Sequence, residues 1–292
     1  MPEWNYLLSV AALEEAPALG AGLQAAAPLA VLGALAFLVR AALPRSLGRW
    51  VTVAREVLLL FPLVLLYFIA RGAAHADPAE ATAHAEQVIA LERTLGIFHE
   101  RALQLAILQS PAAVEIVNGI YIYGHWPVIA VVFVWLARYH RDHLPRYRYA
   151  MILSGAVGVI VFLAYPVAPP RLMPEYDFVD TVFLRSRAYR VLQPTSLTDL
   201  FAAVPSLHVG WNLLMGIALV RESSNRAARA FGAVSPLAMA AAVVLTANHY
   251  FVDVLAGVAL VLVSLAAADR LVARRRAVAN GAGELALGPD VP

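Results

Sequence analysis

Long apolar stretches separated by short polar ones dominate the chain. Seven of them approach the roughly 20 residues that a helix needs to cross the hydrocarbon core of a bilayer. They cover approximately residues 23–41, 53–70, 114–137, 149–168, 205–220, 233–248 and 251–269. Only a tight turn around His249 separates the last two, which suits a re-entry at the membrane surface. The pattern predicts an all-α fold, a polytopic membrane helical bundle of about six or seven transmembrane helices.

The stretch between the second and third apolar segments has another periodicity, in which apolar residues recur at helical spacing opposite charged ones. The apolar positions are Val88, Leu91, Leu95, Phe98, Ala102 and Leu105, and the charged positions are Glu92, Arg93, Glu100 and Arg101. We expect an amphipathic helix that lies at the membrane interface, with these two sets of residues on opposite faces.

Composition supports the membrane class. Of the 292 residues, 61 % are hydrophobic and 14 % are charged, and the mean hydropathy is +0.70, outside the range of soluble domains. The chain has no cysteine, so disulfides, thiolate metal sites and cysteine nucleophiles are excluded. Glu3, Glu14 and Glu15 and the lack of an early positive cluster argue against a cleaved secretory signal.

The basic residues, all 22 of them arginine, are distributed unevenly between the two sides of the expected bundle. One set of loops has fifteen: Arg40, Arg45, Arg49, Arg55, Arg138, Arg141, Arg146, Arg148, Arg221, Arg226, Arg229, Arg270, Arg274, Arg275 and Arg276. The other has seven: Arg71, Arg93, Arg101, Arg171, Arg185, Arg187 and Arg190. The positive-inside rule makes the first set cytoplasmic. We expect an integral protein of the plasma membrane with the ends near His208 and His249 on the extracytoplasmic face.

The chain divides into three parts without an internal repeat. We expect residues 1–52 to form an N-terminal segment with an extra transmembrane helix, and residues 53–270 to form one membrane domain, which carries all the candidates for chemistry described below. Residues 271–292, with several glycines and a proline, are expected to be a disordered cytoplasmic tail.

His249 and Asp253 are the first candidates for chemistry, because an ionisable group in a membrane segment typically costs about 2.5–3.5 kcal/mol. At a spacing of four on a helix, the carboxylate can accept a hydrogen bond from one ring nitrogen and fix the tautomer. The other nitrogen is then a nucleophile, and its attack on a phosphoester gives a phosphohistidine.

His208 and Arg171 complete the expected site on the same membrane face. His208 begins a helix and can protonate a departing alkoxide. Ser206 and the first backbone N–H groups of that helix form an anion site. Arg171, after three prolines, supplies a cation that can hold two phosphate oxygens.

Each feature has a simpler alternative. His249 and Asp253 alone fit a buried polar pair that caps a helix, proline and serine are common at helix starts, and Arg171 alone fits an interfacial anchor. A metal site of two histidines and an aspartate is disfavoured by the neighbouring arginine, so we expect no metal and no cofactor.

A polar stripe in the third apolar segment, Asn118, Tyr121 and His125, recurs at steps of three and four. With Tyr250 it is a candidate lining for a head-group cavity. Hydrogen bonding between transmembrane helices is an equally good explanation of the stripe.

Three strings together resemble the signature motifs of the type 2 phosphatidic acid phosphatase superfamily. They are Pro169-Pro170-Arg171, Pro205-Ser206-Leu207-His208 and His249-Tyr250-Phe251-Val252-Asp253. Leu207 and the form of the third motif are most similar to the inositol phosphorylceramide synthase branch. Leu91-Glu92, Leu95-Gly96 and Glu100 resemble an upstream segment of bacterial members, so the resemblance covers roughly residues 55–270.

The resemblance implies metal-independent phosphoryl or phosphodiester transfer, with His249 as nucleophile, Asp253 orienting it and His208 as acid and base. Two positions depart from the superfamily's phosphatases, which have an arginine where Val243 stands and a glycine where Leu207 stands. Phosphate binding then depends on Arg171. Which of Arg185, Arg187 and Arg190 also serves is open.

Three functions follow as hypotheses. The first is a lipid phosphotransferase that moves a phosphorylated head group, such as phosphoinositol, to an acceptor alcohol. The second is a lipid phosphate phosphatase with the same residues and water as acceptor. The third is a transporter, which predicts broken helices and inverted repeats, and the sequence indicates neither. The expected partners are lipid substrates and the bilayer, with no nucleic acid.

Overall fold

The computed structural model describes residues 51, 53–60, 64, 77–185 and 200–287. Its helices are α4 (Pro78–Thr94), α5 (Glu100–Leu108), α6 (Pro111–Tyr123), α7 (Trp126–Tyr139), α8 (Leu144–Ala164), α9 (Thr181–Arg185), α11 (Leu207–Glu222), α12 (Arg226–Leu245) and α13 (Phe251–Leu287), with short 3-10 turns η1 (Pro170–Leu172) and η2 (Pro174–Tyr176). These residues include no strand, only one isolated bridge between Val167 and Ala202. The all-α prediction is confirmed.

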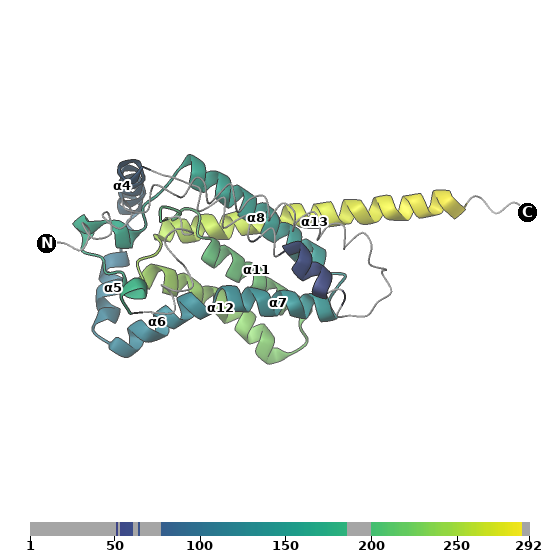
Figure 1. The fold of residues 1–292 in the computed structure, drawn as a ribbon, viewed down its shortest axis with the longest axis horizontal. Helices are drawn as coiled ribbons and strands as arrows, with labels where there is room; N and C mark the ends of the chain where they lie inside the picture. The colour runs from purple at the N-terminus through teal and green to yellow at the C-terminus, as the bar shows by residue number, and fades with distance from the viewer. Residues whose placement is uncertain (1–50, 52, 61–63, 65–76, 186–199, 288–292) are drawn as a thin grey trace, which may run out of the picture.

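The long helices run side by side along the longest axis of the molecule, and α4 lies across one end of them (Figure 1). α11 is central, because it packs against α7, α8, α12 and α13. Leu214 and Met215 on α11 are completely buried. The bundle is therefore organised around the helix that begins with the second motif.

Glycines allow the backbone of α11 to approach its neighbours closely. A Cβ at Gly216 would overlap the backbone oxygen of Gly232 on α12. A Cβ at Gly257 on α13 would overlap the backbone oxygen of Ser206, just before α11. Small residues at such crossings are typical of membrane helices, and here they bring the start of α11 against the first turns of α13.

Three helices are long and apolar enough to cross a membrane: α8, α12 and the part Phe251–Val278 of α13. α6 and α7 pass the same test as a pair, although a bend of 43° separates them. α11, with 16 residues, is shorter than a typical span. The predicted segment 23–41 and half of 53–70 lie outside the described residues. The expected total of six or seven spans is therefore not confirmed.

The segment 114–137, predicted as one span, is broken between Tyr123 and Trp126. Pro127 has no N–H to donate to the Tyr123 carbonyl oxygen, so the helical ladder is interrupted there. The Asn212 side chain on α11 instead donates to the Gly124 carbonyl oxygen at 3.0 Å. The sequence analysis expected no broken helix here. The hydrogen bond from Asn212 connects the break to α11.

The predicted interfacial helix is two helices, α4 and α5, joined by a turn in which Gly96 has φ of 70°. Only glycine adopts this left-handed conformation readily. Glu92 and Glu100 are completely buried, whereas Leu91 and Leu95 are about half exposed. The expected arrangement of faces is wrong at the glutamates, because they meet backbone N–H groups inside the protein.

The last helix of the bundle continues into the segment for which a disordered tail was expected. α13 continues to Leu287 and has 37 residues, which at 1.5 Å per residue is about 55 Å. The hydrocarbon core is about 30 Å thick, so α13 is longer than one crossing requires. It extends well past the rest of the bundle (Figure 1). Alanine, leucine, glutamate and arginine in residues 266–287 are strong helix formers and outweigh the glycines.

We expect Gly257→Ala to lower the thermal unfolding temperature of the purified protein in detergent. The added Cβ would meet the Ser206 backbone, and overpacking of this kind costs about 1–3 kcal/mol. Gly119→Ala is the matched control, because a Cβ there meets nothing within 4 Å and alanine favours the helix. Equal unfolding temperatures for the two variants would contradict this account of the α11–α13 crossing.

Candidate active site

His249 lies in the turn between α12 and α13, two residues before α13 begins. Its Nδ1 lies 2.8 Å from the carbonyl oxygen of Ala203 and 3.3 Å from Oδ2 of Asp253. A carbonyl oxygen only accepts, so Nδ1 carries the proton and Nε2 has the lone pair. Asp253 lies beside His249 as expected, but Nδ1 is closer to the Ala203 carbonyl oxygen than to the Asp253 carboxylate. No sequence pattern indicates Ala203 as a partner.

Main-chain hydrogen bonds hold the turn that carries His249. The N–H groups of Asn248 and His249 both donate to the Val243 carbonyl oxygen, at 2.9 and 3.1 Å. Ala247 has φ of 56°, and its carbonyl oxygen accepts the Arg171 N–H at 2.8 Å. The first and third motifs are thus joined through the backbone.

The second motif joins the same cluster at the start of α11. Ser206 is the N-cap residue, and its N–H donates to the Asp253 carbonyl oxygen at 3.0 Å. Ser206 Oγ is buried, makes no hydrogen bond to any described residue and does not cap the helix. His208 lies in the first turn of α11, whose N–H groups form the positive end of the helix dipole.

The His208 ring packs against other rings. Its centroid lies 4.7 Å from that of Tyr121, 4.3 Å from that of His125 and 5.8 Å from that of His249. His125 also stacks on Trp211 with a centroid distance of 5.8 Å. The structure therefore brings Tyr121 and His125, two candidates for a head-group cavity, to the candidate catalytic histidines.

Asn118 and Tyr250, the other two candidates for lining a head-group cavity, form hydrogen bonds to other segments of the chain. Asn118 Nδ2 donates to the Thr181 carbonyl oxygen, and Thr181 Oγ1 donates to Asn118 Oδ1, each at 2.9 Å. The Tyr250 hydroxyl donates to the Ala168 carbonyl oxygen at 3.1 Å, and its side chain is completely buried. Both side chains connect segments of the fold, and the expectation that they line a head-group cavity stays a prediction.

Arg171 lies in η1, where its Nε is 3.0 Å from Oδ2 of Asp180. Asp180 Oδ1 accepts the Phe183 N–H at 2.9 Å and so begins α9. Asp180 was not foreseen from the sequence, and it orients the guanidinium. Among the other candidate arginines, Arg187 and Arg190 lie outside the described residues, and Arg185 ends α9.

Two glutamates that sequence reasoning did not place in the site reach the start of α13. Glu92 Oε1 accepts the Val252 N–H at 2.7 Å, and Glu100 Oε1 accepts the Phe251 N–H at 3.1 Å. Both side chains are completely buried. The one sequence signal for them was the resemblance of the segment around Gly96 to an upstream family segment.

Burial and a neighbouring acid change the protonation of Glu92. Burial raises the pKa of Glu92 to about 9. The charges of Glu100 and Asp253 add to this shift. Glu92 is therefore protonated at neutral pH.

Val243 and Leu207, the two positions that depart from the superfamily's phosphatases, both have buried side chains packed among apolar neighbours. Val243 is completely buried in an apolar cluster with Met239 and Ala242, which has no place for an arginine. Leu207 is buried against Gly158 of α8, where a Cβ would lie within 3 Å of it. A phosphate must therefore be held by other groups.

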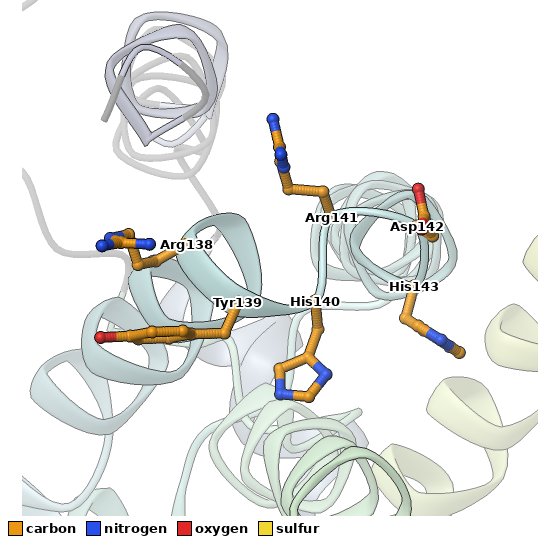
Figure 2. Close-up of a pocket in the computed structure, with 6 residues that line it drawn as sticks. All are labelled: Arg138, Tyr139, His140, Arg141, Asp142 and His143. Carbon is orange, nitrogen blue, oxygen red and sulfur yellow. The ribbon is translucent and has the colours of Figure 1, made fainter. Parts of the chain in front are cut away.

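No three histidine, cysteine, aspartate or glutamate side chains in the described ranges are grouped so that they can hold a metal ion. A surface hollow lies at the C-terminal end of α7, where the chain turns into α8. Its lining residues are Arg138, Tyr139, His140, Arg141, Asp142 and His143. Figure 2 shows that their side chains point in different directions, so this hollow lacks the convergent groups of a binding site.

Comparison with known proteins agrees with this geometry. The PAP2 superfamily matches residues 86–267, more than half of the chain and the whole cluster described above. The chain therefore belongs to the PAP2 superfamily, which includes phosphatases and phosphotransferases. Neither a search of curated proteins nor one of solved structures gave a match.

Proposed function

We propose that this protein is a membrane lipid phosphotransferase that moves a phosphorylated head group from a donor lipid to an acceptor alcohol. The observation that carries the proposal is the Nδ1–H of His249, which donates to Ala203 and Asp253 and leaves Nε2 as a nucleophile. Membership of a superfamily of phosphatases and phosphotransferases supports it.

In the first half of the reaction, His249 Nε2 attacks the phosphorus of the donor. The bond between phosphorus and the donor's alkoxide oxygen breaks as the new P–N bond forms. Protonated His208 gives its proton to the departing oxygen, a role worth about 10²- to 10⁴-fold in rate. Asp253 stabilises the positive charge on the phosphorylated imidazole.

In the second half, the acceptor hydroxyl gives its proton to neutral His208 and its oxygen attacks the phosphorus. The P–N bond breaks, so His249 regains its lone pair and His208 is again protonated. If water takes the place of the alcohol, the same cycle is a hydrolysis. The phosphatase alternative therefore differs only in the acceptor.

The phosphate oxygens require donors, and three groups are suited to this role. Ser206 Oγ makes no hydrogen bond to a described residue, and the first N–H groups of α11 lie beside it. Arg171 is the third, with its guanidinium held at Nε by Asp180. A guanidinium in a fixed orientation binds a phosphate bidentately.

For the transferred group we infer phosphoinositol. This rests on Leu207 in the second motif and on the His249-Tyr250-Phe251-Val252-Asp253 form of the third, both similar to inositol phosphorylceramide synthases. Tyr121 and His125, whose rings lie against that of His208, support this choice, because hydroxyl and imidazole groups can hydrogen-bond a polyol.

We also propose that the site faces the extracytoplasmic side of the plasma membrane. The excess of arginines in the opposite loops supports this orientation. α7 runs from Trp126, beside His125, to Arg138 in its last turn, and Arg141 follows in the connection to α8. A helix of 14 residues is about 20 Å long, so these arginines are remote from the histidines.

His249→Ala is expected to lower turnover about 10³-fold or more, because the covalent step is lost. With an aryl donor whose leaving group needs no proton, His208→Ala should release one equivalent of the phenol in a burst and then stall for lack of a base. Rapid-quench measurement of phenol release tests both variants. Near wild-type turnover by His249→Ala, or no burst from folded His208→Ala, would contradict these roles.

Asp253→Asn is expected to lower kcat about 10- to 100-fold, less than the roughly 10⁴-fold loss where such a change reverses the histidine tautomer. The reason is that the Ala203 carbonyl oxygen still holds the Nδ1–H of His249. KM should stay within about twofold, because only the charge on the phosphorylated intermediate is affected. A loss as large as that of His249→Ala would show that Ala203 does not hold the tautomer.

The reaction itself is tested by mass spectrometry of the products from a panel of labelled phospholipids, with and without an added alcohol. Transfer of the labelled head group to the alcohol is the expected result. Release of the same group into water at a rate independent of the alcohol would favour the phosphatase. Loss of activity in chelator that zinc restores would instead support a metal-dependent reaction.

A further inference from the structure

Carboxyl groups close the N-terminus of α13. The N–H groups of residues 250, 251 and 252 donate to Asp253, Glu100 and Glu92 respectively. A helix begins with up to four N–H groups that have no helical partner, and here side chains take three in succession. This helix end is therefore closed to a phosphate, in contrast to the start of α11.

The two glutamates act within three residues of the candidate nucleophile. The N–H groups that they accept belong to the first two residues of α13, directly after Tyr250 and His249. An N-terminal cap determines where a helix begins and how the preceding chain enters it. Glu92 and Glu100 thus act on the direction of the His249 ring through the backbone.

α4 is also fastened to the segment that leads to Arg171. The Ala168 N–H donates to the Ala81 carbonyl oxygen at 3.0 Å. The Tyr250 hydroxyl donates to the carbonyl oxygen of the same Ala168. α4, the first motif and the start of α13 therefore form one connected unit.

We propose that Glu92 and Glu100 are positioning residues for group transfer: they share one proton and clamp the first turn of α13, which sets how His249 presents Nε2. This inference rests on the proposed function of His249. The clamp itself is a structural property that can be measured without substrate.

The shared proton follows from the environment of the pair. Glu92 Oε2 and Glu100 Oε2 are buried, and no N–H or O–H donor among the described residues reaches them. The other oxygens of the two groups accept the N–H groups of the adjacent residues Phe251 and Val252, so the two carboxyl groups are neighbours. Two neighbouring buried carboxylates disfavour each other's charge, and one proton held between them gives the unpaired oxygens a donor. The other titratable groups that face the pair are Asp253, whose charge disfavours a second anion, and Tyr250, whose hydroxyl is bound to Ala168.

The sign of the pH dependence follows by linkage. The pKa of Glu92 is about 9 in the folded protein and has an ordinary value of 4.5. Between these values the folded state holds a proton that the unfolded state has lost, so stability falls as pH rises through this window. Above it Glu92 is itself charged inside the protein, and the clamp weakens.

The experiment is hydrogen exchange of the full-length protein in detergent, read as protection factors for residues 250–254 at pH 7 and pH 10. Wild type should lose about tenfold or more in protection between the two, the effect of losing a hydrogen bond to a charged group. Glu92→Gln keeps an oxygen for the Val252 N–H and an N–H for Glu100, so its protection should be constant. Glu80→Gln, the same change at an exposed position of α4, should behave as wild type.

Glu92→Leu removes the acceptor and tests the clamp directly. Its protection at residues 250–254 should fall about tenfold or more at pH 7, and kcat should fall with little change in KM. Wild-type protection in a folded Glu92→Leu would overturn the clamp. If that variant does not fold, Glu92→Gln decides, since the same alkaline loss in it as in wild type would overturn the shared proton.

These readouts separate this inference from the proposed function. Protection factors require no turnover, so the clamp stands or fails on them alone. An active His249→Ala would remove the proposed function and leave the exchange results unaffected. Loss of protection in Glu92→Leu without any change in kcat would retain the clamp and overturn its positioning role.

Discussion

One backbone hydrogen bond, from the Ser206 N–H to the Asp253 carbonyl oxygen, holds the crossing on which the candidate site depends. It is possible because Gly257 has no side chain at the point where the two segments meet. A second tie, from His249 Nδ1 to the Ala203 carbonyl oxygen, spans the same crossing. Residues 203–206 and 249–253 therefore behave as one unit, although more than 40 residues separate them along the chain.

The same unit explains why two glutamates are completely buried. A carboxylate is normally kept in water because its desolvation is unfavourable. Glu92 and Glu100 escape this cost by sharing a proton and by accepting N–H groups that would otherwise be unsatisfied at the start of α13. Leu91 on α4 and Leu95, directly after it, are about half exposed. α4 and α5 thus each connect to the helix start that directly follows the turn of His249.

The short-range features of the site were predictable. The spacing of His249 and Asp253 places them in contact, and Ser206 starts a helix with His208 in its first turn. The first motif also lies at the site, since the Arg171 backbone is bonded to the turn before His249. Each of these depends on residues close in sequence or on family motifs. The buried faces of α4 and α5, which carry Glu92 and Glu100, were not predictable in this way. Hydrophobic periodicity does not show which side of a helix meets unsatisfied N–H groups.

By itself, the sequence determined an all-helical membrane protein with three convergent motifs, because apolar length and i, i+4 spacing act within one segment. Only the tertiary structure decided which partners complete the site. Ala203 holds the His249 tautomer, Asp180 holds the Arg171 guanidinium, and Glu92 is buried against α13. The physical reason is the same in each case: the partner is a backbone carbonyl, or a side chain distant along the chain, and only the packing of helices brings it within hydrogen-bonding distance.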